Sequence, residues 1–279
     1  MRIDEALIWA EKTLLKSESA LLDAQVLLAF VLDKETIYLM TWPERVLSQQ
    51  QQMQFEALIE KRETGQPVAH LTGQREFWSL PLKVNNSTLI PRPDTEVLVE
   101  VALDVAVSKE SADLNILDLG TGTGAIIFAL ASELPNAHCM GVDQSEDAIA
   151  LAKLNRAHLA LNQVQLEQSN WFDNVSGGFD IIVCNPPYID AQDKHLDEGD
   201  VRFEPRSALV ANEQGLADIR HLCEHAMKYL KAQGCLLFEH GFEQAGAVQV
   251  LLKENGFQNV KTYQDYAKND RVTLGYKIV

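Results

Sequence analysis

The chain lacks the sequence features that mark membrane, secreted and metal-binding proteins. No apolar run approaches the ~20 residues that a membrane span requires. Residues 1–16 are amphipathic and contain acids, unlike a signal or transit peptide. The four cysteines form no C-x-x-C pair, and the seven histidines show no metal-ligand spacing. We therefore expect a cytoplasmic protein with reduced cysteines, no metal and no membrane association.

Basic residues are also few. The chain has 24 lysines and arginines against 40 aspartates and glutamates, a formal net charge of −16, and no concentrated basic stripe. Because nucleic-acid binding depends on cations that neutralise phosphates, this charge disfavours a nucleic-acid partner and favours a basic protein. The simpler alternative is that the charge only keeps the chain soluble. With 46% hydrophobic residues in 279, the chain can form a sizeable core and about two domains.

Apolar periodicity changes along the chain and predicts three parts. Residues 1–65 show helical spacing and predict a small N-terminal helical domain. Residues 66–87 are typical of a linker that contains a hairpin around Pro81. Residues 88–279 alternate short apolar strands with helices and end in a strand over 272–279. This last part predicts an α/β domain, a parallel sheet with helices on both faces.

A glycine-rich loop joins a predicted strand, 115–119, to a predicted helix, 125–132. The loop residues are Gly120, Thr121, Gly122, Thr123 and Gly124. Glycines permit a tight turn and the close approach of a ligand. Asp143 ends the next predicted strand, about 20 residues further on, where an acid binds a ribose diol in nucleoside-binding α/β folds. We therefore predict a nucleoside cofactor.

The loop alone leaves two cofactors open. Gly120-x-Gly122-x-x-Ala125 also fits the relaxed dinucleotide fingerprint, which would mean NAD. Asp118, at the end of the strand, would repel a pyrophosphate but suits a sulfonium or ammonium group. This acid favours S-adenosyl-L-methionine, and the next motif supports that choice.

The tetrapeptide Asn185-Pro186-Pro187-Tyr188 follows the apolar strand 181–184. The side-chain oxygen of Asn185 and the backbone carbonyl beside the prolines can each accept one N–H of a planar NH2 group. The prolines donate no N–H and hold the loop in one shape. Tyr188 can stack on the flat group behind the nitrogen. We predict that all four residues bind substrate, and that Asn185, Pro186 and Tyr188 are catalytic; the alternative is an ordinary proline turn.

Several segments together carry a family resemblance that extends over almost the whole chain. They are residues 67–78, 89–96, 118–124, 143, 171–172, 185–188, 202–205, 239–241 and 271–275. In these segments the chain resembles the bacterial HemK/PrmC-type release factor glutamine methyltransferases. The resemblance implies a Rossmann-like, seven-stranded class I methyltransferase sheet with one antiparallel strand. It also implies S-adenosyl-L-methionine as methyl donor and class I peptide chain release factors as partners.

The sequence and the resemblance together suggest roles for some of these residues. The predicted cofactor-binding residues are Gly120, Thr121, Gly122, Thr123, Gly124, Asp143, Trp171 and Asn185. Trp171 would cover adenine, or else be a core tryptophan. Asn170 stands where close relatives have aspartate, and its amide oxygen can still accept from the adenine amino group. Arg92 or Glu96 would touch the methionine end, although a proline turn that begins a helix explains this segment equally well.

The polar stretch from 190 to 212 is long for a connection within a domain, and such stretches are more often functional than idle. We interpret it as a loop that covers the substrate. The alternative is an ordered surface loop with Phe203 in the core.

The expected reaction is methylation of N5 of the glutamine in a Gly-Gly-Gln motif. An amide nitrogen is a poor nucleophile because it shares its lone pair with the carbonyl. Two acceptors would orient the NH2 group and stabilise the charge that develops on it. Holding the nitrogen roughly 3–3.5 Å from the methyl group adds proximity. No histidine or carboxylate base is required, since the proton can leave after transfer.

Two other classes of function stay open. A DNA or RNA amino-methyltransferase would use the same tetrapeptide on a flipped base, and the acidic charge argues against it. A non-catalytic binding module would keep the fold without the reaction, and the complete motifs argue against that. We expect a monomer that binds no nucleic acid.

Overall fold

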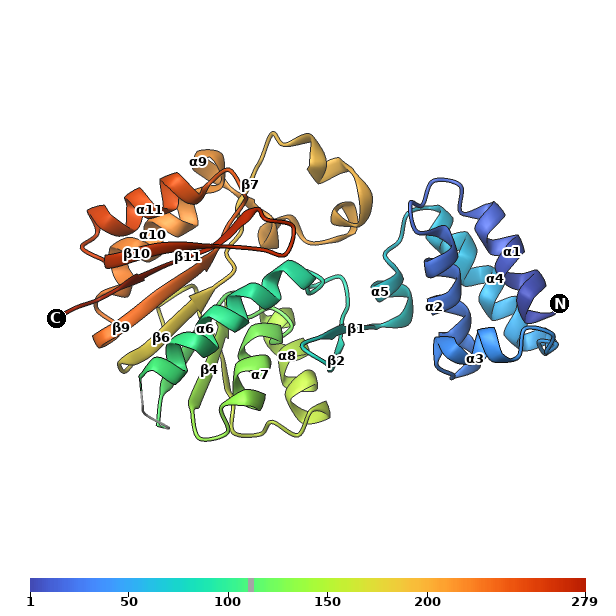
Figure 1. The fold of residues 1–279 in the computed structure, drawn as a ribbon, viewed down its shortest axis with the longest axis horizontal. Helices are drawn as coiled ribbons and strands as arrows, with labels where there is room; N and C mark the ends of the chain where they lie inside the picture. Colours follow the sequence, from blue (N-terminus) through green and yellow to red (C-terminus); the bar gives the residue numbers. More distant parts are fainter. Residues whose placement is uncertain (110–112) are drawn as a thin grey trace. The chain divides into compact units, whose positions relative to one another are not determined.

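The computed structural model describes residues 1–109 and 113–279, and the chain forms two units (Figure 1). The helical unit contains Met1–Gln74 together with Asp197–Phe203. The sheet unit contains Arg75–Leu196 and Glu204–Val279. A short segment from the second half of the chain therefore belongs to the first unit. The three-part division predicted from the sequence stays a prediction; the observed division falls after Gln74.

Amphipathic helices build the helical unit. They are α1 (Ile3–Thr13), α2 (Ala20–Leu32), α3 (Thr36–Thr41), α4 (Gln49–Glu63) and α5 (Val68–Thr72). Helix α4 begins with a capping box, because the Ser48 hydroxyl accepts from Gln51 N and the Gln51 side chain accepts from Ser48 N. Apolar side chains on the facing sides, among them Leu27 and Phe55, form one core. The predicted N-terminal helical domain is confirmed.

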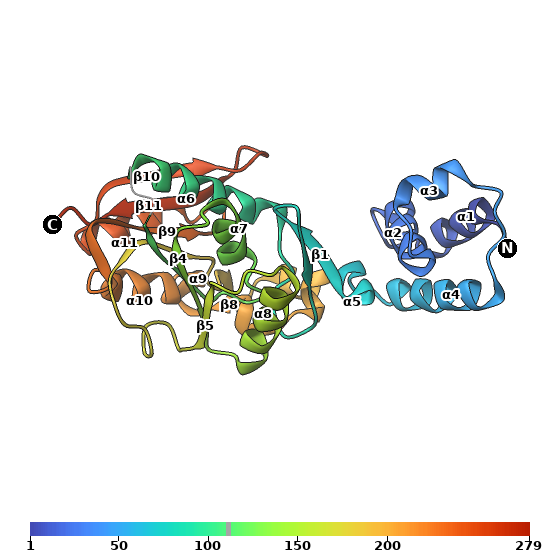
Figure 2. The same cartoon turned by 90° about the horizontal axis from the view of Figure 1, so that it is seen from below.

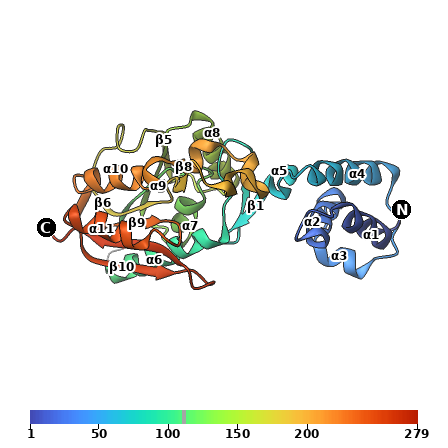
Figure 3. The ribbon, with the colours of Figure 1, turned by 90° about the horizontal axis from the view of Figure 1, so that it is seen from above.

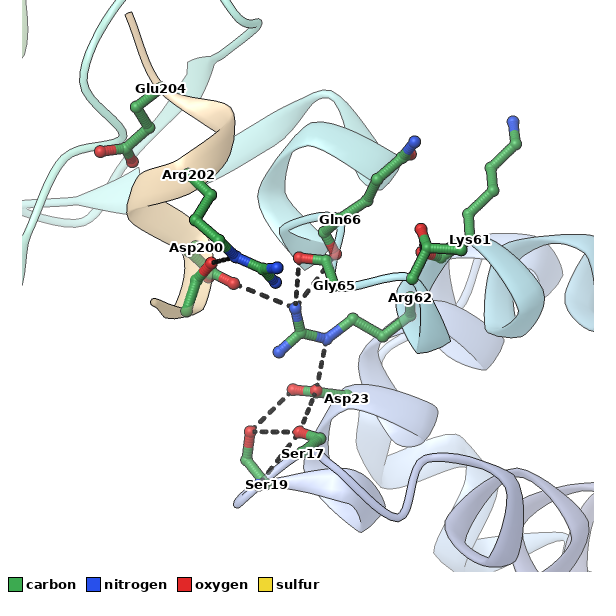
Figure 4. A network of polar contacts seen from close by, with 12 residues as sticks. Ser17, Ser19, Asp23, Lys61, Arg62, Gly65, Gln66, Asp200, Arg202 and Glu204 are labelled. Atoms are coloured by element: carbon green, nitrogen blue, oxygen red, sulfur yellow. Dashed lines mark hydrogen bonds and ion pairs between the residues drawn. The ribbon is translucent and has the colours of Figure 1, made fainter. Parts of the chain in front are cut away.

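Asp23 on α2 is a buried acid with several donors around it (Figure 4). Ser17 Oγ donates to Asp23 Oδ2 at 2.8 Å, and Ser19 Oγ donates to Oδ1 at 2.9 Å. Arg62 Nε donates to Oδ2 at 2.7 Å. On its other side, Arg62 Nη1 donates to Asp200 Oδ1 at 3.0 Å. Arg62 therefore joins α2, the end of α4 and the segment 197–203 within one unit.

A hairpin follows the helices, and its turn is not where we predicted it. Strands β1 (Gln74–Phe77) and β2 (Leu80–Lys83) pair with each other. The turn lies at Trp78 and Ser79, whose φ angles are 52° and 59°. Positive φ at both positions is typical of the type I′ hairpin turn, and proline cannot adopt it, so Pro81 lies within β2 instead.

The sheet unit is built on seven strands. They are β3 (Asn115–Leu119), β4 (His138–Asp143), β5 (Gln165–Gln168), β6 (Phe179–Cys184), β9 (Leu230–Glu239), β10 (Gln258–Gln264) and β11 (Asp270–Tyr276). Their order in the sheet is β10-β11-β9-β6-β3-β4-β5. Strand β11 is antiparallel to both of its neighbours, and the other pairs are parallel. This confirms the predicted class I methyltransferase sheet.

Helices cover both faces of this sheet. Along β3, Ile116 faces a core shared with α6 (Glu96–Ser108), α7 (Ala125–Glu133) and α8 (Glu146–His158). The next residue, Leu117, faces a core shared with α10 (Ala217–Ala226) and α11 (Ala245–Glu254). Figure 2 and Figure 3 show α6 and α10 on opposite sides of the strands. The alternation of apolar residues with period two produces this two-sided burial.

The polar stretch from 190 to 212 forms short elements in place of a structureless loop. They are β7 (Ile189–Asp190), the 3₁₀ turns η2 (Lys194–Asp197), η3 (Gly199–Phe203) and η4 (Arg206–Ala208), and β8 (Val210–Ala211), which pairs with β7. In α9 (Asn212–Gly215), which follows directly, Glu213 and Gln214 have φ of 55° and 57°. Left-handed backbone at two successive non-glycine residues is strained, and such strain clusters at functional sites.

Two further sequence expectations concern membrane association and the redox state of the cysteines. Among the residues described, no helix is both long enough and apolar enough to cross a membrane. The four cysteines are buried and form no disulfide. Burial raises the pKa of the Cys139 thiol to about 12, so this group stays protonated at neutral pH.

Candidate active site

A cavity of about 440 Å³ lies at the carboxyl ends of β3, β4 and β6, a size typical of small-molecule sites. Of the predicted site residues, those that line it are Gly120, Thr121, Gly122, Thr123, Asp143, Trp171, Asn185 and Pro187. In the described part of the chain, Gly124, Pro186 and Tyr188 are not part of the lining. The fold thus brings most predicted residues together, and their roles stay predictions.

The glycine loop turns sharply because its glycines adopt left-handed backbone. Gly120 has φ of 73°, and both Gly120 N and Thr121 N donate to the Val142 carbonyl at 2.9 Å. Gly124 precedes α7 with φ of 85°, and a Cβ there would lie 2.0 Å from the Phe128 ring. Gly124 is therefore required for packing, whereas the loop before it faces the cavity.

Asp143 presents a carboxylate at the end of β4. Its Oδ2 accepts from Gly122 N at 3.0 Å, and its Oδ1 accepts from Ser145 N at 2.9 Å. Burial raises its pKa, while these two backbone bonds lower it. Each oxygen keeps a lone pair, so the carboxylate can accept from two adjacent hydroxyls of a ribose.

Asp118 is the second acid of this region and is completely buried. Thr121 Oγ1 donates to its Oδ2 at 2.6 Å, and its Oδ1 has no hydrogen-bond partner in the described residues. Burial, together with the neighbouring Asp143, raises the pKa of Asp118 to about 7, although the hydrogen bond from Thr121 lowers it. A carboxylate so poorly compensated favours a cation nearby.

Trp171 closes another part of the cavity. It has φ of 49°, and its ring would lie 3.6 Å from a Cβ placed on Gly120. Burial raises the pKa of Asp218, and a hydrogen bond from Trp171 lowers it. Asn170 Nδ2 donates to Asp173 Oδ2 at 3.2 Å, which leaves the Asn170 oxygen as an acceptor beside the cavity. The tryptophan and the amide therefore lie where a flat, amino-bearing ring could be held.

Asn185 is the first residue after β6, and its carboxamide has a defined partner. Its Nδ2 donates to Thr95 Oγ1 at 3.3 Å. Thr95 is buried, is the last residue of the 3₁₀ turn η1 (Pro93–Thr95) and also lines the cavity. With Nδ2 engaged, the Asn185 oxygen is the atom left to accept from a ligand.

Tyr188 turns toward the protein and not toward the cavity. Its Oη donates to Glu239 Oε1 at 3.3 Å, and its carbonyl accepts from Gln244 Nε2 at 3.0 Å. A Cβ on Gly215 would lie 2.0 Å from the same carbonyl, so only glycine permits this approach. The loop 185–188 is therefore held from both sides.

A buried ion pair joins two segments singled out in the sequence. Arg92 Nη2 donates to both carboxylate oxygens of Glu204 at 2.8 Å, and Ile90 N donates to Glu204 Oε1 at 3.2 Å. Arg92 and Glu96 were predicted beside the cofactor, but neither is part of the described cavity lining; Glu96 accepts from Trp78 N at 2.9 Å. Thr95, which belongs to the same segment as Arg92 and Glu96, does line the cavity.

The end of the long polar stretch also reaches the cavity. The lining residues from this stretch are Ser207, Ala208, Val210, Ala211 and Asn212. Phe203, placed in the core by the alternative interpretation, is only partly buried. That the stretch covers the substrate stays a prediction.

Sequence reasoning gave no role to Thr95 and Asp218, which line the cavity, or to Glu239, which accepts from Tyr188 outside the described lining. Glu239 could have been found, since it ends an apolar strand as Asp143 does and as Asp118 nearly does. Thr95 and Asp218 begin helices, where threonine and aspartate are common for local reasons. The sequence therefore did not distinguish them as residues of the site.

Two protein families match the chain. Residues 5–73 match the family described as PrmC N-terminal domain. Residues 110–265 match a family described as methyltransferase domain.

Individual proteins match over nearly the whole length. A release factor glutamine methyltransferase of Shewanella oneidensis is 54% identical over 275 residues, covering 98% of this chain and 95% of that protein. The protein of the same name in Escherichia coli is 49% identical over 260 residues, covering 93% of each. The crystal structure of a methyltransferase from Pyrococcus furiosus covers 80% of this chain and 98% of that one, with a TM-score of 0.54 at 16% identity. This last similarity shows the fold alone.

Proposed function

Because the chain belongs to the release factor glutamine methyltransferase family, we propose that it methylates N5 of the glutamine in the Gly-Gly-Gln motif of class I peptide chain release factors. The single observation that carries the proposal is the carboxamide of Asn185. It lies at the carboxyl end of β6, lines the cavity and has its NH2 group engaged by Thr95 at 3.3 Å. Its oxygen is thus the acceptor available to a substrate amide.

The site fits S-adenosyl-L-methionine, which supplies an electrophilic methyl group on a sulfonium when it is bound. Asp118 is buried with one oxygen unpartnered in the described residues, and such an acid suits a cation. Asp143 would accept from the ribose hydroxyls, and the loop 120–123 would lie against the ligand. Trp171 would cover the adenine, and Asn170 would accept from its amino group.

The substrate amide would be held by acceptors alone. Asn185 Oδ1 would accept one N–H of the glutamine, and the predicted second acceptor is the backbone carbonyl beside the prolines. Two fixed acceptors orient the NH2 group and stabilise the positive charge that develops on nitrogen. The prolines keep the loop in one shape, and the bond from Gln244 to the Tyr188 carbonyl supports it. No side chain has to act as base, since the proton leaves after transfer.

The partner proposed for this site is a protein with a basic surface. The net charge of −16 repels nucleic acid at long range and attracts a basic protein. We infer further that the enzyme acts as a monomer in the cytoplasm and needs neither nucleic acid nor a membrane.

A methyl-transfer assay with labelled S-adenosyl-L-methionine tests the acceptor. Purified full-length release factor, its Gln→Ala variant at the tripeptide, duplex DNA and ribosomal RNA are offered in parallel. Label on the native factor and on none of the other acceptors is the expected result. Label on nucleic acid, with none on either protein, would overturn the proposal.

A further inference from the structure

Glu239 is a buried acid beside the Asn185 loop, and the reaction outlined above gives it no task. It ends β9 with 1% of its surface exposed. Its Oε1 accepts from Tyr188 Oη at 3.3 Å, and its Oε2 has no hydrogen-bond partner in the described residues. A buried carboxylate with so few donors lowers stability when it is ionised, so its presence requires an explanation.

The Thr95 hydroxyl connects Glu239 to Asn185. Its oxygen accepts from Asn185 Nδ2 at 3.3 Å. The pairing of Cys184 with Phe238 puts Asn185 and Glu239 at adjacent positions at the carboxyl ends of β6 and β9, and the Thr95 hydroxyl lowers the pKa of Glu239, as a donor to the ionised form does. Thr95 makes no side-chain capping bond to α6, and its oxygen accepts from Asn185, so its proton remains to be donated. The three side chains therefore lie in one cluster, which is a relay of carboxylate, hydroxyl and carboxamide when Thr95 donates to Glu239.

The charge of Glu239 sets the direction of every bond in this relay. An ionised carboxylate can only accept, so the single hydroxyl proton of Thr95 points to it. The Thr95 oxygen can then only accept, so Asn185 has to present Nδ2 to it and Oδ1 to the other side. A protonated Glu239 can donate to Thr95, which can then donate to the Asn185 oxygen. The carboxamide would turn over and present an NH2 group to the substrate NH2 group.

We propose that Glu239 is a positioning residue, which holds the Asn185 carboxamide in its accepting orientation through Thr95, so that methyl transfer requires the ionised acid. This inference rests on the proposed function. It adds a residue that touches neither the substrate nor the cofactor but decides which atom of Asn185 meets the substrate amide.

The surroundings of Glu239 set the pH at which the relay reverses. Burial raises its pKa to about 7, while Thr95, Arg271 and Tyr188 lower it and Asp94 raises it. The titratable and charged groups that face it or lie next to it are Arg271 on β11, Asp94 in η1, Cys184 and Tyr188 at the end of β6, and His240. Burial raises the pKa values of Cys184 and Tyr188 and lowers that of His240, so these three are neutral near pH 7.

The test is the pH dependence of kcat between pH 5.5 and 9, with release factor and S-adenosyl-L-methionine both saturating. As the pH increases across this range, we expect kcat of the parent enzyme to rise about 10-fold or more, with a midpoint near pH 7. Glutamine resembles the protonated acid, so Glu239→Gln should stay at the low level across this range. The KM for S-adenosyl-L-methionine should change little. Glu243→Gln, the same substitution at an exposed residue outside the site, should keep the parent profile.

A second variant keeps the test independent of one substitution. Thr95→Val retains the shape but removes the hydroxyl, and it should lose the rise in kcat as Glu239→Gln does. Because both residues act through one relay, the double variant should be no slower than the slower single variant. Losses that multiply would overturn the inference, as would a Glu239→Gln enzyme with the parent profile. A parent enzyme that leaves release factor unmodified at every pH would overturn the proposed function as well.

Discussion

Asp23 in the helical unit and Glu239 in the sheet unit are both buried acids, but their surroundings differ (Figure 4 shows the first). Both oxygens of Asp23 accept bonds of 2.7–2.9 Å, from two serines and Arg62. Glu239 accepts a bond of 3.3 Å from Tyr188, its second oxygen has none from the residues described, and the further donor that we propose for it is Thr95. A buried acid that is fully supplied with donors holds local structure together. One that is poorly supplied lowers stability and is retained for what its charge does.

Removing the charge of Asp23 should have the largest effect on stability. In Asp23→Asn, one of the donors would meet an NH2 group, and Arg62 would lose its buried counter-ion. We expect the free energy of unfolding of the helical unit to fall by about 2–3 kcal/mol. Urea denaturation followed by circular dichroism measures it.

The matched control is Asp4→Asn, which removes an exposed ion pair with Arg2 from the same unit. Its effect should stay below about 1 kcal/mol. Equal effects of the two substitutions would mean that the donors around Asp23 contribute little.

The equivalent substitution at Glu239 should have the opposite sign. The folded-state pKa of Glu239 is raised to about 7, above its ordinary value, so its contribution to stability is present at low pH and is lost as pH rises through 7. Glu239→Gln cannot ionise and avoids this loss. At pH 8 we expect the variant to be more stable than the parent by on the order of 1–2 kcal/mol.

Denaturation at pH 8 and at pH 5 checks both the sign and its cause. The advantage of Glu239→Gln should shrink as pH falls from 7 toward 4.5, because the parent acid is then protonated in the folded state and increasingly protonated in the unfolded state. A variant that is less stable than the parent at pH 8 would show that Glu239 stabilises the fold, as Asp23 does.

The smallest of the predicted effects is that of Tyr188→Phe on the pH dependence of kcat. It removes the 3.3 Å bond to Glu239 but keeps the ring. Because this bond lowers the pKa of Glu239, its loss should move the rise of kcat to higher pH, by less than about one pH unit. A shift to lower pH would contradict the hydrogen-bond direction assigned here.

The sequence predicted the sheet and the cavity because both depend on local patterns. Strand β3 ends in Asp118-Leu119, strand β4 ends in Asp143, and the two strands are parallel neighbours. The residues that follow them therefore lie at the same end of the sheet. We misplaced the hairpin turn because proline, here Pro81, is common in turns. Tryptophan and serine do not predict a positive φ, so Trp78 and Ser79 were not recognised as the turn residues.

The contacts around the predicted residues could not be predicted in this way. Thr95 and Asn185 are 90 positions apart, and Arg62 and Asp200 are 138 apart. Periodicity shows which face of an element is buried but not which polar group on another element it meets. Tyr188 is an example, since nothing in its local sequence predicted that its hydroxyl donates to Glu239 at the end of β9.

The most direct test of the account is single-turnover methyl transfer to release factor by Asn185→Ala, with S-adenosyl-L-methionine affinity measured in parallel. The account predicts that transfer slows by at least about 100-fold, the lower end of the typical cost of removing one oriented hydrogen-bonding group from such a site. Affinity for the cofactor should stay largely intact. Transfer at the parent rate would contradict the central claim that the Asn185 oxygen holds the substrate amide.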